Sequence, residues 1–152
     1  MEASDRKHGE RVAEFFERDR FARESGIRIV EVRAGFGQAE LTVEPRHLNS
    51  VGILQGGALF TLADLAFALA CNSHGVVAVG TQVDVTWFKA VRSGRLTATA
   101  EELFRTHRLS TCLVRVTGED GELVALFKGI AYIKGTPLWT EPSPPAPAPG
   151  TR

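Results

Sequence analysis

The sequence predicts an α+β domain in which an antiparallel six-stranded sheet wraps around one central helix, with a short helix before it. A helix-like run over residues 58–71 is apolar on nearly every face, so it must be buried nearly all round. Six strand-like segments are joined by short turns, and no alternation of helices and strands supports parallel crossovers. Since a single sheet encloses a helix only by curling, the wrapped sheet is the simplest architecture.

The N-terminal part of the chain supplies the first helix and two strands. The charge-rich residues 1–9 are expected to be flexible. Residues 10–24 place phenylalanines among charges at the spacing of an amphipathic surface helix. Residues 26–45 are typical of a hairpin, with the Gly-Phe-Gly segment at 35–37 in the turn. Pro45 ends the second strand because proline cannot donate to a ladder.

The central helix and the remaining strands follow a loop. Glycines open the helix at Gly56, and residues 72–75 are well suited to end it. From residue 135 onward the chain has too much proline and too little apolar content to pack, so 135–152 is expected to be a disordered tail and 10–134 the domain. The four later strands are expected within residues 76–91, 95–106, 108–120 and 122–134.

Composition excludes several classes of protein. The 152 residues include 18 basic and 18 acidic side chains, so no overall cationic field favours nucleic acid. The longest strongly apolar run, 56–71, is shorter than the ~20 residues that span a bilayer, and Asp64 interrupts it. Cys71 and Cys112 lie in apolar surroundings, which predicts reduced thiols in a cytoplasmic protein. No spacing of cysteines or histidines indicates a metal, and no cofactor is expected.

Asp64 is the anomaly in the central helix, because its apolar neighbours leave no helix face that is expected to be exposed to solvent. Burial of an ionised carboxylate is costly and raises its pKa. Three interpretations stay open from the residues alone: Asp64 bonds a polar partner structurally, lines a catalytic cleft, or is simply exposed.

The start of the helix, Gln55-Gly56-Gly57, is the second unusual feature. The first amides of a helix lack internal partners and lie at the positive end of its dipole, so two of them could form an oxyanion hole; equally, the glycines could only permit the turn. Asp64 lies about 12 Å along the axis from Gly56. A catalytic carboxylate must come within about 3 Å of its target. If both features are catalytic, two antiparallel copies of the helix must share each site.

The segment 47–75 resembles the signature of the hotdog-fold acyl-CoA thioesterases of the phenylacetic-acid-degradation type. That signature has an asparagine, a glycine three positions on, His-Gly-Gly, and Leu-Ala-Asp; here these are Asn49, Gly52, 55–57 and 62–64. The resemblance extends over roughly residues 19–134. It implies the hotdog fold, dimers that pair their helices, and a homotetramer, as in many members.

The resemblance also implies roles for individual residues. Asp64 corresponds to the carboxylate that attacks the thioester carbon or activates water, Gly56 to the backbone donor that polarises the carbonyl, and Asn49 to the side chain that positions the carboxylate or the water. Gln55 replaces the usual histidine. Glutamine exchanges hydrogen bonds but does not ionise, so it suffices if that position only orients the loop and the carbonyl.

The expected substrate is an acyl-CoA with an aromatic or medium-size acyl group. Because coenzyme A carries phosphates, cations should line the mouth of the site. The alternatives are a noncatalytic acyl-CoA-binding hotdog protein and a hotdog enoyl-thioester hydratase or dehydratase. The candidate binding residues are Gly57, Thr81, Gln82, Arg105 and Arg108, then the cations Lys89, Arg92 and Arg95, with Phe60, Phe67, Trp87 and Phe88 as possible walls of an aromatic pocket.

Overall fold

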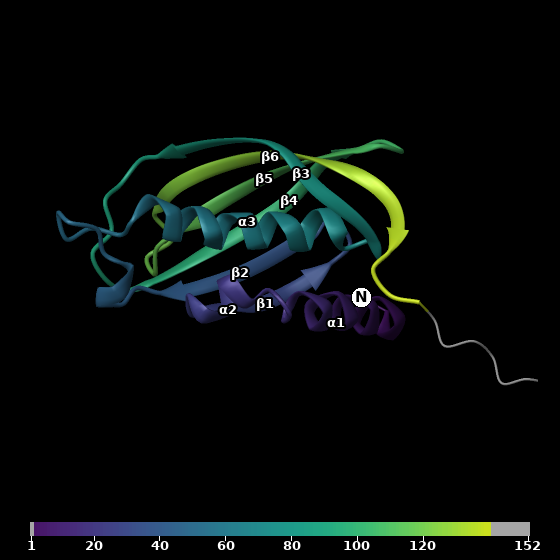
Figure 1. Ribbon diagram of the computed structural model, residues 1–152, viewed down its shortest axis with the longest axis horizontal. Helices are drawn as coiled ribbons and strands as arrows, with labels where there is room; N and C mark the ends of the chain where they lie inside the picture. Colours follow the sequence, from purple (N-terminus) through teal and green to yellow (C-terminus); the bar gives the residue numbers. More distant parts are fainter. Residues whose placement is uncertain (1, 141–152) are drawn as a thin grey trace, which may run out of the picture.

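The computed structural model describes residues 2–140 and confirms the sheet wrapped around a helix. All neighbouring strands are antiparallel, in the order β1-β2-β4-β5-β6-β3, and helix α3 (Gly56–Asn72) lies along the concave side of the sheet (Figure 1). Since β1 and β3 have one neighbour each, they are the edges of the sheet. The strands are β1 (Ile27–Arg33), β2 (Phe36–Thr42), β3 (Val76–Trp87), β4 (Arg95–Arg105), β5 (Leu109–Thr117) and β6 (Leu123–Pro137).

The core forms where α3 meets the inner face of the sheet. Leu62 and Leu69 of α3 are fully buried, and the Phe67 ring lies against the backbone of β6. A Cβ atom at Gly129 would stand 2.7 Å from that ring, so only glycine permits this contact. Phe127 packs beside Phe67 with 5.6 Å between ring centroids. This packing fixes the rotation of α3 about its axis and therefore decides which of its residues face outward.

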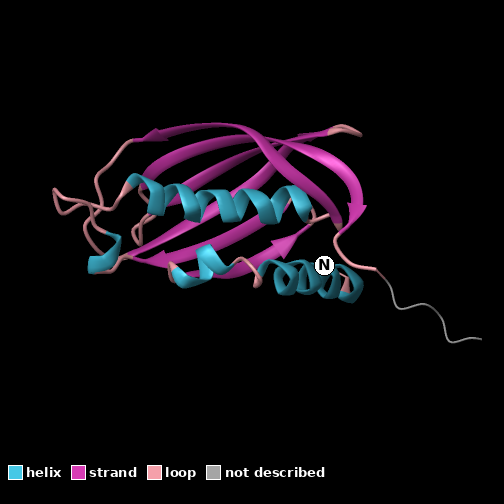
Figure 2. Cartoon of the chain, viewed as in Figure 1, coloured by secondary structure: helices cyan, strands magenta, loops and turns pink. Residues whose placement is uncertain are grey.

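One face of α3 is open in the single chain, so the expectation of burial nearly all round is wrong. Gly57, Phe60 and Asp64 are exposed, and their spacing of three and four residues places them on one side of the helix. The sheet covers most of the other sides, as Figure 2 shows, and no element within residues 2–140 covers this one. The apolar neighbours of Asp64 in the sequence, such as Leu62 and Leu65, are buried against the other sides, and Asp64 itself lies on the uncovered side.

The N-terminal segment is more ordered than the sequence predicted. Helix α1 (Ala3–Phe16) begins within the segment expected to be flexible, and a second helix, α2 (Arg20–Glu24), follows it in place of one helix over 10–24. A Cβ atom at Gly9 would lie 2.1 Å from the Val32 carbonyl oxygen, so glycine lets α1 lie directly against β1. The Asp19 side chain accepts the Ala22 N–H and starts α2 separately.

The turns differ from the prediction in detail. Gly35 adopts a φ of 70° in the β1–β2 turn, but Phe36 and Gly37 already belong to β2. A short 3-10 helix, η1 (Pro45–His47), follows β2. The ring of His47 is buried and bonds the Glu44 N–H and the Ser25 carbonyl, so this histidine has a structural role.

The C-terminal boundary expected at residue 135 is also wrong. Strand β6 continues to Pro137, Leu138 is buried, and the Trp139 ring packs against His8 and the Arg11 guanidinium of α1. The apolar pair Leu138 and Trp139 is therefore sufficient to pack this proline-rich segment against the domain, because α1 lies beside it. The rest of the expected tail, 141–152, lies outside the described residues. Among residues 2–140, no helix combines the length and the apolar character that a bilayer crossing needs.

Candidate active site

The first turn of α3 is capped by its own N-cap side chain. The Oε1 atom of Gln55 accepts hydrogen bonds from the backbone N–H groups of Gly57 and Ala58. The N–H of Gly56 has no acceptor among the described residues. The expected pair of free amides is therefore reduced to one, because glutamine occupies the second.

A loop carrying Asn49 lies beside this amide. Asn49 Oδ1 accepts the N–H groups of Val51 at 3.0 Å and Ile53 at 3.2 Å. These bonds fix the orientation of the side-chain amide and leave its Nδ2 group to donate elsewhere. We name the adjoining space of about 400 Å³ the amide cavity. Its lining comprises Asn49, Ile53, Leu54, Gly56, Leu59 and Trp87 to Val91.

Asp64 lies at a different hollow, of about 280 Å³, that we name the aspartate cavity. Its carboxylate makes no hydrogen bond or ion pair with any described residue, which disfavours the structural interpretation within one chain. Although one side of the carboxylate reaches water, desolvation by the surrounding protein raises its pKa, and the negative charge of Asp19 raises it further. Such a carboxylate is a stronger base than an ordinary aspartate.

The two cavities have no residue in common. Gly56 belongs to the first and Asp64 to the second, as their separation of about 12 Å along the helix axis requires. One chain therefore does not bring the free amide and the carboxylate to the same reacting atom.

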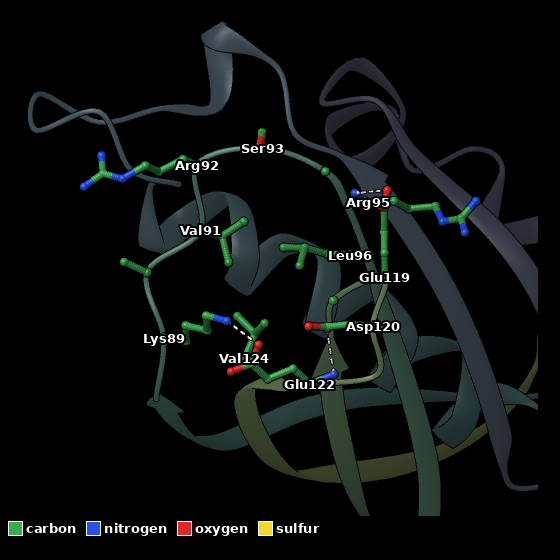
Figure 3. Close-up of a pocket in the computed structure, with 13 residues that line it drawn as sticks. Lys89, Val91, Arg92, Ser93, Arg95, Leu96, Glu119, Asp120, Glu122 and Val124 are labelled. Carbon is green, nitrogen blue, oxygen red and sulfur yellow. Dashed lines mark hydrogen bonds and ion pairs between the residues drawn. The ribbon is translucent and has the colours of Figure 1, made fainter.

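A third hollow, of about 350 Å³, adjoins the amide cavity through Lys89, Ala90 and Val91 (Figure 3). Acidic side chains balance the cations here, since Lys89 forms an ion pair with Glu122. The guanidinium groups of Arg92 and Arg95 point away from the hollow in Figure 3. This hollow therefore presents no concentrated positive charge to a phosphate.

The arginines favoured by the sequence lie elsewhere. Arg105 Nη1 donates to the Cys71 carbonyl at 3.1 Å and to Glu102 Oε2 at 3.0 Å, so it caps the C-terminal end of α3, opposite Gly56. Arg108 donates to the hydroxyl of Tyr132 at 3.0 Å. Both side chains are engaged within the protein, and neither lines the amide cavity.

The two polar candidates on β3 are exposed on this edge strand. Thr81 donates its hydroxyl to the Ile130 carbonyl at 3.1 Å, and Gln82 pairs with Ile130 in the β3–β6 ladder. Neither lines the amide cavity or the aspartate cavity. Within residues 2–140, no group of three or more potential metal ligands converges.

Sequence reasoning missed several walls of these cavities. Phe15, Phe16 and Leu138 line the aspartate cavity, far along the chain from the Asp64 segment. By contrast, Trp87 and Phe88, which the sequence offered as walls of an aromatic pocket, do line the amide cavity, and the Trp87 ring would lie 3.4 Å from a Cβ atom at Gly56. The available signals were the adjacent phenylalanines in a charged helix and the Leu138-Trp139 pair in a proline-rich segment.

Comparison with known proteins agrees with this architecture. A model of the thioesterase superfamily matches residues 51–125. The chain is 35% identical to the acyl-coenzyme A thioesterase PaaI of Escherichia coli K12 over 123 residues, which cover 80% of this chain and 88% of that protein. The structure of E. coli PaaI, from the phenylacetic acid degradation operon, superposes with a TM-score of 0.84 at 30% identity, covering 88% of this chain and 98% of that one.

A further crystal structure, of a hypothetical thioesterase protein with coenzyme A from Streptococcus pneumoniae TIGR4, has a TM-score of 0.70 at 26% identity. The alignment covers 73% of this chain and 88% of that one. The family model, the sequence identity and the shared fold agree with one another. The chain therefore belongs to the thioesterase superfamily, as a hotdog-fold thioester hydrolase of the PaaI type.

Proposed function

We propose that the protein hydrolyses an acyl-CoA thioester to a free acid and coenzyme A, at a site that two copies of the chain share. The free amide of Gly56 from one copy and the carboxylate of Asp64 from the other act on the same carbonyl. The observation that carries this proposal is the placement of these two groups in separate cavities on the open face of one helix.

A second copy would also cover what a single chain leaves exposed. Large apolar side chains, Phe60, Trp87 and Phe88, are exposed at the open face and at the end of the edge strand β3. Uncovered apolar surface of this kind is typical of an interface. Two antiparallel α3 helices would place each Gly56 near the partner's Asp64. A homodimer is therefore the minimal unit, and a homotetramer follows from the resemblance to the family.

The reaction proceeds by carbonyl addition. The thioester oxygen accepts the Gly56 N–H, while ionised Asp64 attacks the carbon directly or removes a proton from an attacking water. Negative charge then builds on the oxygen, and one fixed donor aimed at it is worth roughly 10²–10³ in rate. On collapse the C–S bond breaks and the coenzyme A thiolate leaves. In the water route the thiolate takes the proton that Asp64 accepted; in the direct route, water next hydrolyses the acyl–Asp64 anhydride.

Asn49 and Gln55 position the groups that react with the thioester. The fixed orientation of Asn49 supports a role for its Nδ2 group in positioning the water or the carboxylate. Gln55 holds the first turn through the Gly57 amide and thereby directs the Gly56 N–H outward. A neutral glutamine suffices for this task, because no proton transfer is required of it.

The coenzyme A portion extends from the amide cavity. Lys89 lines that cavity, and its ion pair with Glu122 is exposed, so a phosphate can displace the carboxylate. Lys89 is therefore a better candidate than Arg105, which caps α3. The coenzyme A found with the Streptococcus pneumoniae relative supports this class of substrate. The free, buried thiols of Cys71 and Cys112 support a cytoplasmic location.

Complementation between two inactive variants tests the shared site. Asp64→Ala removes the carboxylate. Gly56→Pro removes the N–H at the first helical position, where proline is well tolerated. Mixed and reassembled in equal amounts, the two variants should recover about a quarter of the wild-type thiol release, because half the dimers are mixed and each has one intact site. Each variant alone should release thiol at least about 10²-fold more slowly than the wild type.

Three results would contradict the proposal. Failure of mixed dimers to recover activity, with exchange verified by native mass spectrometry, would place both groups of a site in one chain. Acyl-CoA binding without thiol release by the wild-type protein would favour the noncatalytic acyl-CoA-binding alternative, and conversion of an enoyl-CoA would favour the hydratase. Both assays are therefore run on the same preparation.

A further inference from the structure

We infer that the aspartate cavity binds the acyl group of the substrate, and that α1 and the segment after β6 set the size of the acyl group accepted. This inference rests on the proposed function, because it requires Asp64 to meet the thioester. The cavity adjoins Asp64 directly, so a thioester carbon at the carboxylate has this apolar space next to it.

The walls of the cavity offer little to a polar ligand. Apolar side chains form most of the surface, and Asp64 is the charged residue among them. The amide of Asn72 is fully used, since Nδ2 donates to the carbonyls of Ala68 and Ala78 and Oδ1 accepts the Ala78 N–H. The Cys71 thiol bonds the Ala68 carbonyl. The cavity therefore suits an uncharged, apolar occupant.

The amide cavity has a different character. It includes the Asn49 amide and the free Gly56 N–H, which match polar and anionic groups, and Lys89 is among its residues. In the shared site the two cavities lie on opposite sides of the carbonyl. The acyl side of the thioester therefore faces the apolar cavity, and the sulfur side faces the polar one.

The volume of this hollow on one chain indicates which acyl groups its walls can hold. An apolar cavity of about 150 Å³ holds a benzene ring. The aspartate cavity measures about 280 Å³, so it has room for one aromatic ring with a short linker or for an aliphatic chain of medium length. The rings of Phe16 and Phe67 are among its walls and suit either group.

Three walls of this space lie outside the part of the chain that the family model matches. Phe15 and Phe16 come from α1, and Leu138 follows β6, whereas the model covers 51–125. Contact between α1 and Trp139 holds these two elements together. Residues outside the matched segment would thus contribute to substrate selection.

Substitutions that change the volume of the cavity test the inference. Ala68 is half-buried, one turn of α3 beyond Asp64, so Ala68→Leu fills the cavity. We expect the ratio of kcat/KM for octanoyl-CoA to that for acetyl-CoA to fall at least tenfold, and the same ratio for phenylacetyl-CoA to fall likewise. Phe16→Ala enlarges the cavity and should raise the ratio for decanoyl-CoA several-fold. The exposed turn residue Ala34 supplies the control, Ala34→Leu, which should leave every ratio unchanged.

The outcomes distinguish this inference from the proposed function. An equal fall for acetyl-CoA and octanoyl-CoA in Ala68→Leu, or unchanged ratios in both variants, would overturn the inference while thiol release by the wild-type protein upholds the proposed function. Absence of thiol release from every acyl-CoA by the wild-type protein would overturn both. Thermal unfolding of each variant verifies folding, and Phe16→Ala decides the question if Ala68→Leu does not fold.

Discussion

The Oε1 atom of Gln55 accepts the backbone N–H of Gly57, and this bond leaves the N–H of Gly56 as the outward-facing donor at the start of α3. A histidine is usual at position 55 in the family that this chain resembles. The glutamine here uses its acceptor atom to cap the helix. The distinction between the capped and the uncapped amide leads directly to two predictions.

Gly56→Pro should lower kcat by roughly 10²–10³, since in the proposed mechanism it removes the backbone donor to the oxyanion. The fold should survive, because Gln55 already has the extended backbone, at ψ 131°, that a residue before proline prefers. Steady-state thiol release and circular dichroism check the two parts. A variant that keeps its full rate would show that the Gly56 amide does not contact the carbonyl.

Gln55→Glu should change stability and activity in opposite directions. A carboxylate still accepts the Gly57 N–H and interacts favourably with the helix dipole, by roughly 0.3–1 kcal/mol. Its negative charge beside the developing oxyanion should nevertheless lower kcat at least tenfold. Thermal unfolding and thiol release on one preparation measure both effects, and Gln55→Ala, which loses the cap, is the control expected to unfold at a lower temperature.

Much of the fold followed from local patterns. The apolar run that became α3 and the alternation in the later strands depend on which side of each element is buried, and periodicity reports that directly. The boundaries did not follow, because they depend on distant contacts. Gly9 packs on Val32, and Trp139 packs on His8, so the ends of the domain support each other.

The parts of the site whose positions depend on helix geometry alone could be predicted from the sequence. The separation of Gly56 and Asp64 follows from the rise of any α-helix, and the two groups do lie in separate cavities. The positions of the other candidate side chains depend on tertiary contacts. Arg105 donates a hydrogen bond to the carbonyl of Cys71, 34 residues earlier in the chain. No residue spacing in the sequence predicts this hydrogen bond.

The pH dependence of hydrolysis should report the environment of Asp64. Desolvation and the charge of Asp19 raise its pKa, so the acid limb of kcat/KM should lie above the ordinary value of about 3.9. Asp19→Asn retains an oxygen that accepts the Ala22 N–H but removes the charge, so the limb should move to lower pH. Profiles from about pH 4 to about pH 8 measure the shift. An identical limb in both proteins would exclude Asp19 as an influence on the pKa of the Asp64 carboxylate.

The two thiols should be inert in the folded protein. Burial raises the pKa of Cys71 to about 12 and that of Cys112 to about 11, so thiolate is scarce at mild alkaline pH. We expect an aromatic disulfide reagent to titrate neither thiol before unfolding and both after addition of denaturant. Rapid reaction of the native protein would show that the end of α3 opens readily.

Glu102→Gln should destabilise the protein at neutral pH, because Glu102 is hydrogen-bonded to several polar side chains at the C-terminal end of α3. Its carboxylate accepts hydrogen bonds from Ser110, Arg105 and His74. Burial raises the pKa of Glu102, but these three bonds outweigh burial and hold it below the ordinary value. The stabilisation is therefore present above the unfolded-state pKa and is lost as the pH falls through the lower, folded-state value.

Loss of the charge should cost about 2 kcal/mol of unfolding free energy near neutral pH, the usual worth of hydrogen bonds to an ionised group. The difference from wild type should shrink at acidic pH, where Glu102 is protonated in both states. Urea unfolding at the two pH values measures this. Glu101→Gln, at the exposed neighbour, is the matched control and should change stability by less than about 0.5 kcal/mol. Equal losses in both variants would mean that general charge, and not the bonds at Glu102, holds the end of α3.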